Sequence, residues 1–326
     1  MKLTMVCVVW GWKYTRLFRD YTLRTLLASG NIPYWSKNKQ KNILKIYCPR
    51  EDWLMLKRSP AKLQLEDYVT IQWIRINPPP ARHNPHPTVV PYHKEVIQEC
   101  IDNDSSVMFL CPDIVLSNNV FKEIKKQMGA GKEVVVCNGL RILKNNDELL
   151  TRHDGEITTG FAVDYWVRNM HPISAGCFIN AQDFTNLPSN LFYQKSKKII
   201  SGRCCHQHPL FIKHPRPHNG NNMIDGPYMN EYRDIMDKIH VVDNSKMVLL
   251  SFTPEMSNHF YRKGVIKPRE RRMADINRFV SNQLPVHKML YNKEITFRGY
   301  SFTDKDMGKV VQVSEDALLP EDLGLV

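Results

Sequence analysis

One short apolar segment in the middle of the chain most constrains its fold. Residues 107–111 are five consecutive apolar residues, too few for a typical helix, and they predict a strand buried on both faces. Pro112, which cannot continue a central strand, and the carboxylate Asp113 come next. A helical pattern over 117–129 and an apolar strand over 133–137 complete a β-α-β unit. Because open α/β sheets bind ligands at the carboxyl ends of their strands, Asp113 is predicted to lie at a ligand site.

The segments before this unit repeat the alternation of strand and helix. Strands are expected over 3–10, 43–47 and 69–76, with helices over 14–28 and from Pro49 onward. The dense prolines of 77–91 predict a stiff surface loop, and a helix over 92–101 follows. In the β-α-β unit, Ser117 is the expected N-cap of the helix. Gly129 is the expected C-cap, in the left-handed backbone conformation. The pattern predicts an α/β fold with a mostly parallel sheet and helices on both faces.

The character of the chain changes after Cys137. Its apolar runs become short and turn-rich, which predicts a smaller mixed or antiparallel region. We therefore expect a first half over 1–137, a second region of the same domain over 138–313 and an acidic tail over 314–326. A basic helix over 269–280 could dock on anionic lipid, and a solvated helix face is the alternative interpretation.

Composition limits the classes of protein that this chain can belong to. The 326 residues are 42% hydrophobic and 10% aromatic, which argues against extensive disorder. No apolar run approaches the length of a membrane span, and the eight cysteines include no CxxC pair, so reduced thiols of a cytoplasmic protein are expected. Lys and Arg exceed Asp and Glu by 45 to 33, and this net charge of +12 favours an anionic partner.

Two further motifs are candidates for chemistry. In His206-Gln207-His208-Pro209-Leu210 the two histidines are two residues apart, so on a strand both would point to the same face and could share a metal or flank a phosphate. Asp225 lies in a turn before an expected helix. Read alone, the histidines are more typical of ordinary polar residues in a basic loop, and Asp225 is typical of a helix N-terminus.

Several motifs together carry a resemblance to a known group of proteins. They are the run Val9-Trp10-Gly11 … Tyr14 … Leu17-Phe18 … Thr22 to Pro33, the run Ile46 to Asp52, Phe109 to Asp113, the His-x-His-Pro-Leu run at 206–210, and Ile224-Asp225. In these motifs the chain resembles bacterial GT-A-type glycosyltransferase-like proteins, which have the nucleotide-diphospho-sugar transferase fold. The resemblance spans residues 3 to about 232 and implies a GT-A-like, Rossmann-type sheet.

The resemblance also implies an activity and a set of site residues. The expected function is transfer of a sugar from a nucleotide-activated donor to a glycan, glycoconjugate or lipid-linked acceptor in surface polysaccharide biosynthesis. Such transfer needs a donor pocket, stabilisation of the leaving diphosphate and usually a carboxylate that deprotonates the acceptor hydroxyl. The residues expected to bind the donor are Trp10, Gly11, Tyr14, Arg50, Tyr92, His93 and Asp113. Asp225 is the expected base.

A divalent cation is the cofactor that the resemblance implies. GT-A enzymes commonly hold one on a DxD motif, and Asp113 is similar in position, but Pro112-Asp113-Ile114-Val115 has no second acid. Asp113 with His208 could hold Mn²⁺ or Mg²⁺ through waters, and Lys and Arg side chains could instead neutralise the diphosphate.

Three other functions compete with the glycosyltransferase. A metal hydrolase would use the His-rich segment 206–218, but the chain has no compact acid–histidine motif. A nucleotidyltransferase of the same fold would normally show a Gly-rich triphosphate loop where this chain has Trp10-Gly11-Trp12-Lys13. A non-enzymatic protein that binds nucleic acid or an anionic surface would explain the charge, but no recognition motif is present, so no specific nucleic-acid partner is expected. The expected location is the cytoplasm, with peripheral contact at the inner membrane face as the further expectation from the basic helix.

Overall fold

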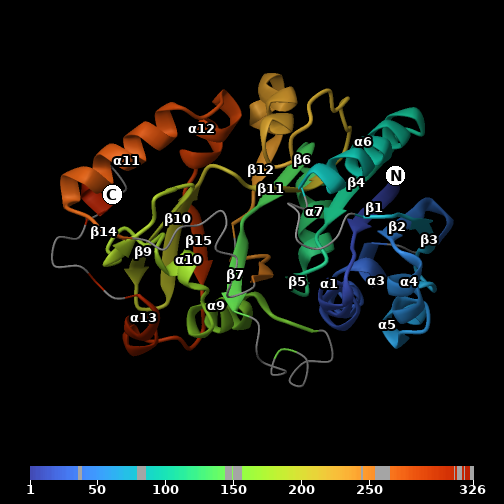
Figure 1. Ribbon diagram of the computed structural model, residues 1–326, viewed down its shortest axis with the longest axis horizontal. Coiled ribbons are helices and arrows are strands. Elements are labelled where there is room, and N and C mark those ends of the chain that lie inside the picture. Colours follow the sequence, from blue (N-terminus) through green and yellow to red (C-terminus); the bar gives the residue numbers. More distant parts are fainter. Residues whose placement is uncertain are drawn as a thin grey trace. The chain divides into compact units, whose positions relative to one another are not determined.

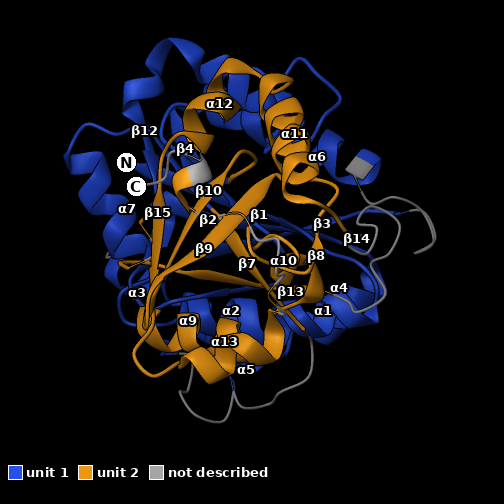
Figure 2. Ribbon diagram, turned by 90° about the vertical axis from the view of Figure 1, so that its left-hand side faces the viewer, with its two compact units in different colours: residues 1–137, 147–157, 208–242 blue, residues 138–146, 158–207, 243–326 orange. Residues whose placement is uncertain are grey.

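The computed structural model describes residues 1–35, 39–78, 86–143, 149, 156–243, 245–253, 265–311, 313, 318 and 320–323. The chain divides into two compact units, coloured separately in Figure 2. Unit 1 comprises residues 1–137, 147–157 and 208–242, and unit 2 comprises 138–146, 158–207 and 243–326. The chain thus leaves unit 1 at the expected boundary but returns to it over 208–242, so the second region is not the continuous stretch 138–313. Most of the expected acidic tail lies outside the described residues.

Unit 1 is built on a seven-stranded sheet with the strand order β12-β6-β11-β4-β1-β2-β3. Strands β1, β2, β3 and β4 are mutually parallel, β12 is parallel to β6, and β11 is antiparallel to both of its neighbours (Figure 1). The predicted mostly parallel sheet is therefore confirmed. The bounds are β1 Lys2–Val8, β2 Asn42–Cys48, β3 Thr70–Arg75, β4 Ser105–Leu110, β6 Val134–Cys137, β11 His208–Ile212 and β12 Ile239–Val241.

Helices cover both faces of this sheet, as the sequence predicts. The ring of Phe109 on β4 meets His93 of α6 (His86–Asp102), with ring centroids 5.1 Å apart. Phe211 on β11 pairs with Met108, the neighbour of Phe109, and so points to the other face. There it meets Trp35 of α3 (Ile32–Trp35), and Trp35 also contacts Phe121 of α7 (Val120–Gly129).

The first helical segment contains an irregularity that the sequence pattern does not reveal. Its residues form α1 (Trp12–Leu17), a π-helical turn (Phe18–Thr22) and α2 (Leu23–Leu26) in succession. Such π-turns are rare and frequently lie at functional sites. The remaining elements of unit 1 are α4 Arg50–Leu56, α5 Pro60–Leu65, the strand β5 Ile114–Leu116, and 3₁₀ segments over Lys39–Lys41 and Pro227–Lys238.

Two predicted boundaries in unit 1 are wrong. Helix α6 begins at His86, inside the segment predicted as loop, because Pro87 falls in the first turn, where its missing N–H needs no partner, and Pro91 is tolerated inside the helix. Helix α7 is preceded by Asn119 rather than Ser117. The last residue of α7 is Gly129. The left-handed backbone conformation expected at Gly129 is adopted instead by Gly131, which has φ of 82°.

Unit 2 is the smaller mixed region that the sequence predicts. An antiparallel sheet has the order β15-β10-β9, β13 runs parallel to β7, and β14 pairs with β8. The strands are β7 Gly139–Leu143, β8 Asp183–Phe184, β9 Asn190–Ser196, β10 Ile199–Cys204, β13 Leu249–Thr253, β14 Val265–Ile266 and β15 Ile295–Arg298. The helices are α9 Thr159–Arg168, α10 Pro172–Ala175, α11 Arg269–Ser281, α12 Pro285–Tyr291 and α13 Asp304–Val310, with a 3₁₀ turn over Pro320–Leu323.

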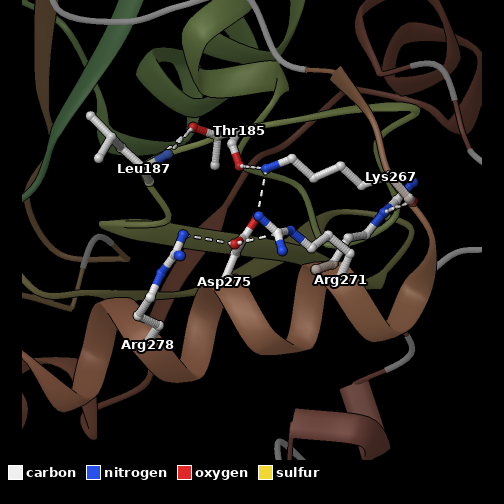
Figure 3. A network of polar contacts seen from close by, with 7 residues as sticks. Thr185, Leu187, Lys267, Arg271, Asp275 and Arg278 are labelled. Atoms are coloured by element: carbon white, nitrogen blue, oxygen red, sulfur yellow. Dashed lines mark hydrogen bonds and ion pairs between the residues drawn. The ribbon is translucent and has the colours of Figure 1, made fainter.

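The predicted basic helix exists as α11, but not all of its cations face solvent. Lys267, just before the helix, is buried and its ammonium lies 2.8 Å from the carboxylate of Asp275 (Figure 3). Arg272 is fully buried, and its guanidinium donates to the main-chain oxygens of Lys267 and Ile179. Fewer charges are thus available for a lipid surface than the sequence suggests.

The eight cysteines are free thiols, as predicted, and seven of them are buried. The exception is Cys111, which is half-buried. None of the helices formed by described residues has the length and apolar character required to cross a bilayer.

Candidate functional site

The candidate site lies at the carboxyl edge of the sheet of unit 1, where β1 ends in a tight turn. Gly11 adopts φ of 80°, a conformation that disfavours any side chain, and immediately precedes α1. Its N–H donates to Asp52 Oδ2 at 2.9 Å, and the hydroxyl of Thr15 donates to Asp52 Oδ1 at 2.9 Å. Asp52 is buried in the first turn of α4. A carboxylate of α4, the helix that follows β2, therefore fixes the turn after β1.

Asp113 lies in the loop between β4 and β5, and a neighbouring side chain holds the main chain on both sides of it. The hydroxyl of Thr22, the last residue of the π-turn, is 2.8 Å from the main-chain oxygen of Ile114 and 3.2 Å from that of Pro112. Burial and the nearby negative charge of Asp113 raise the pKa of Tyr14. Asp113 and Tyr14 are therefore close to each other, after the ends of β4 and β1.

His208 is the first residue of β11, and because β11 is antiparallel it begins at the same edge. Its Nε2 lies 2.8 Å from the main-chain oxygen of Phe109 on β4. A carbonyl oxygen only accepts, so Nε2 carries the proton and the neutral ring leaves Nδ1 as a lone-pair donor. Nδ1 forms no hydrogen bond with a described residue.

The charge of Asp225 acts on the same imidazole. Burial lowers the pKa of His208, whereas its hydrogen bond to Phe109 and the nearby Asp225 carboxylate oppose this change. His208 and Asp225 are therefore neighbours, although 17 positions separate them in the chain. Asp225 is half-buried, in the turn before the 3₁₀ segment Pro227–Lys238.

Two more histidines lie in this region, because His93 is close to His208 and His218 is close to His93. His93 of α6 is 6% exposed, and its Nδ1 has no hydrogen-bond partner among the described residues. Burial, together with the proximity of His208 and His218, lowers the pKa of His93 to about 3. His218 donates through Nε2–H to the main-chain oxygen of Asn222 at 2.8 Å, and its ring stacks on that of Tyr228. His93 stays neutral over the physiological range and cannot supply a positive charge to a phosphate.

The other residues predicted to bind the donor are Trp10, Arg50, Tyr92 and His93. Tyr92 and His93 lie in the second turn of α6, so the helix N-terminus that was expected to direct them at a phosphate is not there. The ring of Tyr92 packs 5.0 Å from that of Tyr47. Trp10 is half-buried beside the Gly11 turn, and Arg50 is exposed at the start of α4, so both stay predictions as donor contacts.

His206 does not share a strand with His208. It precedes β11 and belongs to unit 2, where its Nε2 lies 2.8 Å from Gln283 Oε1 and its ring centroid is 4.4 Å from that of His287. The expectation that both histidines point to one face is therefore wrong, because the alternation of a strand does not extend to His206.

Sequence reasoning missed three residues that organise this edge. Thr22 holds the Asp113 loop, Asp52 holds the Gly11 turn, and His218 adjoins His93. A sequence signal existed only for Asp52, as an acid in the first turn of a helix that follows a strand. The other two act through contacts between residues far apart in the chain.

The side chains available near Asp113 determine whether a divalent cation can bind there. No group of three His, Cys, Asp or Glu side chains that could hold a metal occurs within the described part of the chain. The Nε2–H of His208 donates to a main-chain carbonyl, which is the arrangement that orients a metal-binding imidazole through its other nitrogen. One carboxylate is also enough for Mg²⁺ when substrate phosphates and waters complete its shell. These side chains suit a cation that binds together with a phosphorylated substrate.

Comparison with known proteins gives structural likenesses only. No protein-family model matches the chain, and no curated protein matches it. Among solved structures, TarS of S. aureus has 7% identity over 45% of this chain and 23% of its own, with a TM-score of 0.32. Mouse xyloside xylosyltransferase 1 has 8% identity over 43% and 54%, with a TM-score of 0.29. A Bacillus anthracis protein described as a glucose-1-phosphate thymidylyltransferase has 9% identity over 44% and 56%, with a TM-score of 0.25.

These matches span less than two thirds of each of the three proteins. Because all three TM-scores lie below 0.5, we base the functional proposal on the site itself.

Proposed function

We propose that the chain is a glycosyltransferase that moves a sugar from a nucleotide-activated donor to a glycan or glycoconjugate acceptor in the synthesis of surface polysaccharide. The observation that carries this proposal is the meeting of polar side chains at one edge of the unit 1 sheet. Asp113 follows β4, Tyr14 follows β1, and His208 with Asp225 nearby begins β11. Ligands of open α/β sheets bind at this edge.

The turn after β1 and the Asp113 loop form the donor side of the proposed site. Trp10 and Tyr14 would flank the base and ribose, and the Gly11 turn leaves room for the nucleotide because it has no side chain. Asp113 would lie beside the diphosphate, where its loop is held by Thr22. Arg50 is exposed and would contribute positive charge to the same group.

Asp225 and His208 form the acceptor side. In the transfer, the bond from the anomeric carbon to the diphosphate oxygen breaks and the diphosphate leaves with the electron pair. The acceptor oxygen bonds to the anomeric carbon, and its proton passes to the Asp225 carboxylate. His208 is neutral and is fixed through Nε2, so its Nδ1 could accept a hydrogen bond from the acceptor or bind a cation. A divalent cation, Mn²⁺ or Mg²⁺, would be held by Asp113 and His208 and would neutralise the diphosphate.

The nucleotidyltransferase remains the competing enzyme, and its products differ. Sugar transfer releases a nucleoside diphosphate, whereas nucleotidyl transfer from a nucleoside triphosphate to a sugar phosphate releases pyrophosphate. We would incubate the purified chain with Mn²⁺ or Mg²⁺, a panel of nucleotide-sugars and mixed glycan acceptors, and separately with nucleoside triphosphates and sugar phosphates. Release of a nucleoside diphosphate that requires Asp225 supports the proposal. Release of pyrophosphate alone would contradict it.

A further inference from the structure

Unit 2 contains an open hollow of about 510 Å³ beside the tip of the β9–β10 hairpin. Its walls come from the hairpin turn, with Lys197 and Lys198, and from the end of β15, with Arg298 and Tyr300. The two walls are joined because Ile199 pairs with Arg298 and the N–H of Gly299 donates to the main-chain oxygen of Lys198.

The hollow carries three positive charges, and none of the described residues that line it has a carboxylate. Lys197, Lys198 and Arg298 are exposed, and none of them forms an ion pair with a described residue. The adjacent Lys195 behaves differently, because its ammonium lies 2.9 Å from Glu294. Unpaired cations gathered around a concave surface attract an anion.

A buried carboxylate fixes the wall formed by residues 299–302. Asp164 of α9 is 3% exposed and accepts hydrogen bonds of 2.8–3.0 Å from the N–H groups of Tyr300, Ser301 and Phe302 and from the hydroxyl of Ser301. Arg168 donates to the same hydroxyl at 2.8 Å. The main chain that presents Tyr300 is thus preorganised, which lowers the entropic cost of binding.

The ring of Tyr300 packs against Gly160 of α9. A Cβ atom at Gly160 would lie 2.4–2.5 Å from three atoms of this ring, so the ring can lie there only because Gly160 has no side chain. Tyr300 is nevertheless 58% exposed. An aromatic side chain that is fixed on one face and open on the other is a rigid amphipathic contact surface, and the C–H face of a pyranose ring packs well on such a surface.

We infer that this hollow, the hairpin–β15 site defined by Lys197, Lys198, Arg298 and Tyr300, binds an acidic saccharide. The cations would pair with its carboxylates or phosphates while Tyr300 packs on a sugar ring. The volume is that of a small-ligand pocket. Binding of single-stranded nucleic acid generally uses a longer basic groove with several aromatic platforms, whereas the described lining here offers one aromatic ring.

This site does not depend on the transferase proposal, because all of its residues belong to unit 2 and its test is binding at equilibrium. Trigalacturonic acid would be titrated into the full chain by calorimetry. Maltotriose serves as the uncharged saccharide, inorganic phosphate as the simple anion and an oligothymidylate of ten nucleotides as the nucleic acid. The variants are Arg298→Gln, Lys197→Gln with Lys198→Gln, and Tyr300→Ala. Lys288→Gln removes an exposed cation of α12 as the matched control.

The expected result is binding of trigalacturonic acid that weakens about tenfold in each charge variant and in Tyr300→Ala, and that is unchanged in Lys288→Gln. Binding should also weaken as salt rises. Tyr300→Phe should bind nearly as the wild type does, which separates loss of the ring from loss of the fold. Equal affinity for phosphate alone, tighter binding of oligothymidylate, or unchanged affinity in the charge variants would each overturn the inference.

Discussion

His208 and Phe109 are joined by a hydrogen bond of 2.8 Å from the ring Nε2 to the main-chain oxygen, although 99 positions separate them in the chain. This bond ties the start of the antiparallel strand β11 to the central strand β4 and fixes the tautomer of the imidazole. The remaining nitrogen and the nearby Asp225 thereby reach the edge at which Asp113 lies. Replacement of His208 by Gln should break this orientation and lower transfer more than it lowers stability.

The Asp225 carboxylate is the proposed base, so Asp225→Asn should remove proton acceptance without changing the shape of the turn. We expect kcat to fall by about 10²–10⁴-fold, with the Kd for the donor changed by less than about twofold. Steady-state kinetics and donor titration measure the two quantities. Asp237→Asn, an exposed acid of unit 1, is the control and should be fully active. A variant of Asp225 with wild-type kcat would assign the base to another residue.

Thr22 is expected to act on catalysis through Asp113. Thr22→Val keeps the shape of the buried side chain but removes the hydroxyl that holds the oxygens of Pro112 and Ile114. Stability should fall by about 1 kcal/mol. The KM for the donor should rise because the loop that carries Asp113 is no longer fixed. The matched variant Thr70→Val, on the exposed position of β3, should change neither quantity. An unchanged KM in Thr22→Val would show that the loop is held by other contacts.

Cys111 should be the thiol that reports on the donor site. It is half-buried two positions before Asp113, whereas burial raises the pKa of Cys7, Cys137 and Cys204. Native alkylation followed by peptide mass spectrometry should modify Cys111 first, since the thiolate is the reactive form. A bound nucleotide-sugar should slow this modification. Alkylation of all eight cysteines at one rate, or a rate at Cys111 that no donor changes, would contradict the account.

The ion pair of Lys267 and Asp275 in Figure 3 should stabilise unit 2 in a pH-dependent way. Burial tends to raise the pKa of Asp275, but the hydrogen bond and charge of Lys267, with Arg271 and Arg278, outweigh it and hold the pKa below its usual value. A carboxyl group with a lower pKa in the folded state contributes stability above its unfolded pKa of about 4, and this contribution is lost as the pH falls below that value.

Asp275→Asn should therefore cost about 2–3 kcal/mol at pH 7, because it leaves Lys267 buried without its counter-charge. The difference from the wild type should shrink on acidification towards pH 3. Thermal unfolding over a series of pH values measures both. Asp234→Asn removes an exposed partner of Arg216 and should leave the midpoint of unfolding close to that of the wild type. A cost for Asp275→Asn that does not change with pH would show that the charge is not responsible.

Local patterns were sufficient to predict β1, β2, β3, β4 and β6 of unit 1, whereas β5 was missed. The apolar run 107–111 corresponds to β4, Ser105–Leu110, and the following helix and strand to α7 and β6. Their parallel order follows from short alternating elements and from the rule that crossovers connect parallel strands. The return of 208–242 to this sheet could not be predicted, because the pairing of β11 with β4 and β6 depends on partners more than 70 positions away.

The candidate site could be predicted only in part, for the same reason. Asp113 was identified because it directly follows a buried strand. The closeness of His208 and Asp225 was a hypothesis from topology, and it is supported by the effect of Asp225 on the imidazole. The burial of His93 and the role of Thr22 depend on packing between α6, β4 and the π-turn, which leaves no periodic signal in the sequence.

The most direct test of the central claim is the change in melting temperature of the wild type and of Asp113→Asn in the presence of a panel of nucleotides and nucleotide-sugars with Mn²⁺. Without ligand the two should melt within a few degrees of each other, because a loop carboxylate contributes little to the core. We predict that at least one nucleotide-sugar, at a hundredfold excess over its Kd, raises the melting temperature of the wild type by roughly 5–10 °C and that of Asp113→Asn much less. No shift with any member of the panel, or equal shifts in both proteins, would contradict a donor site at Asp113.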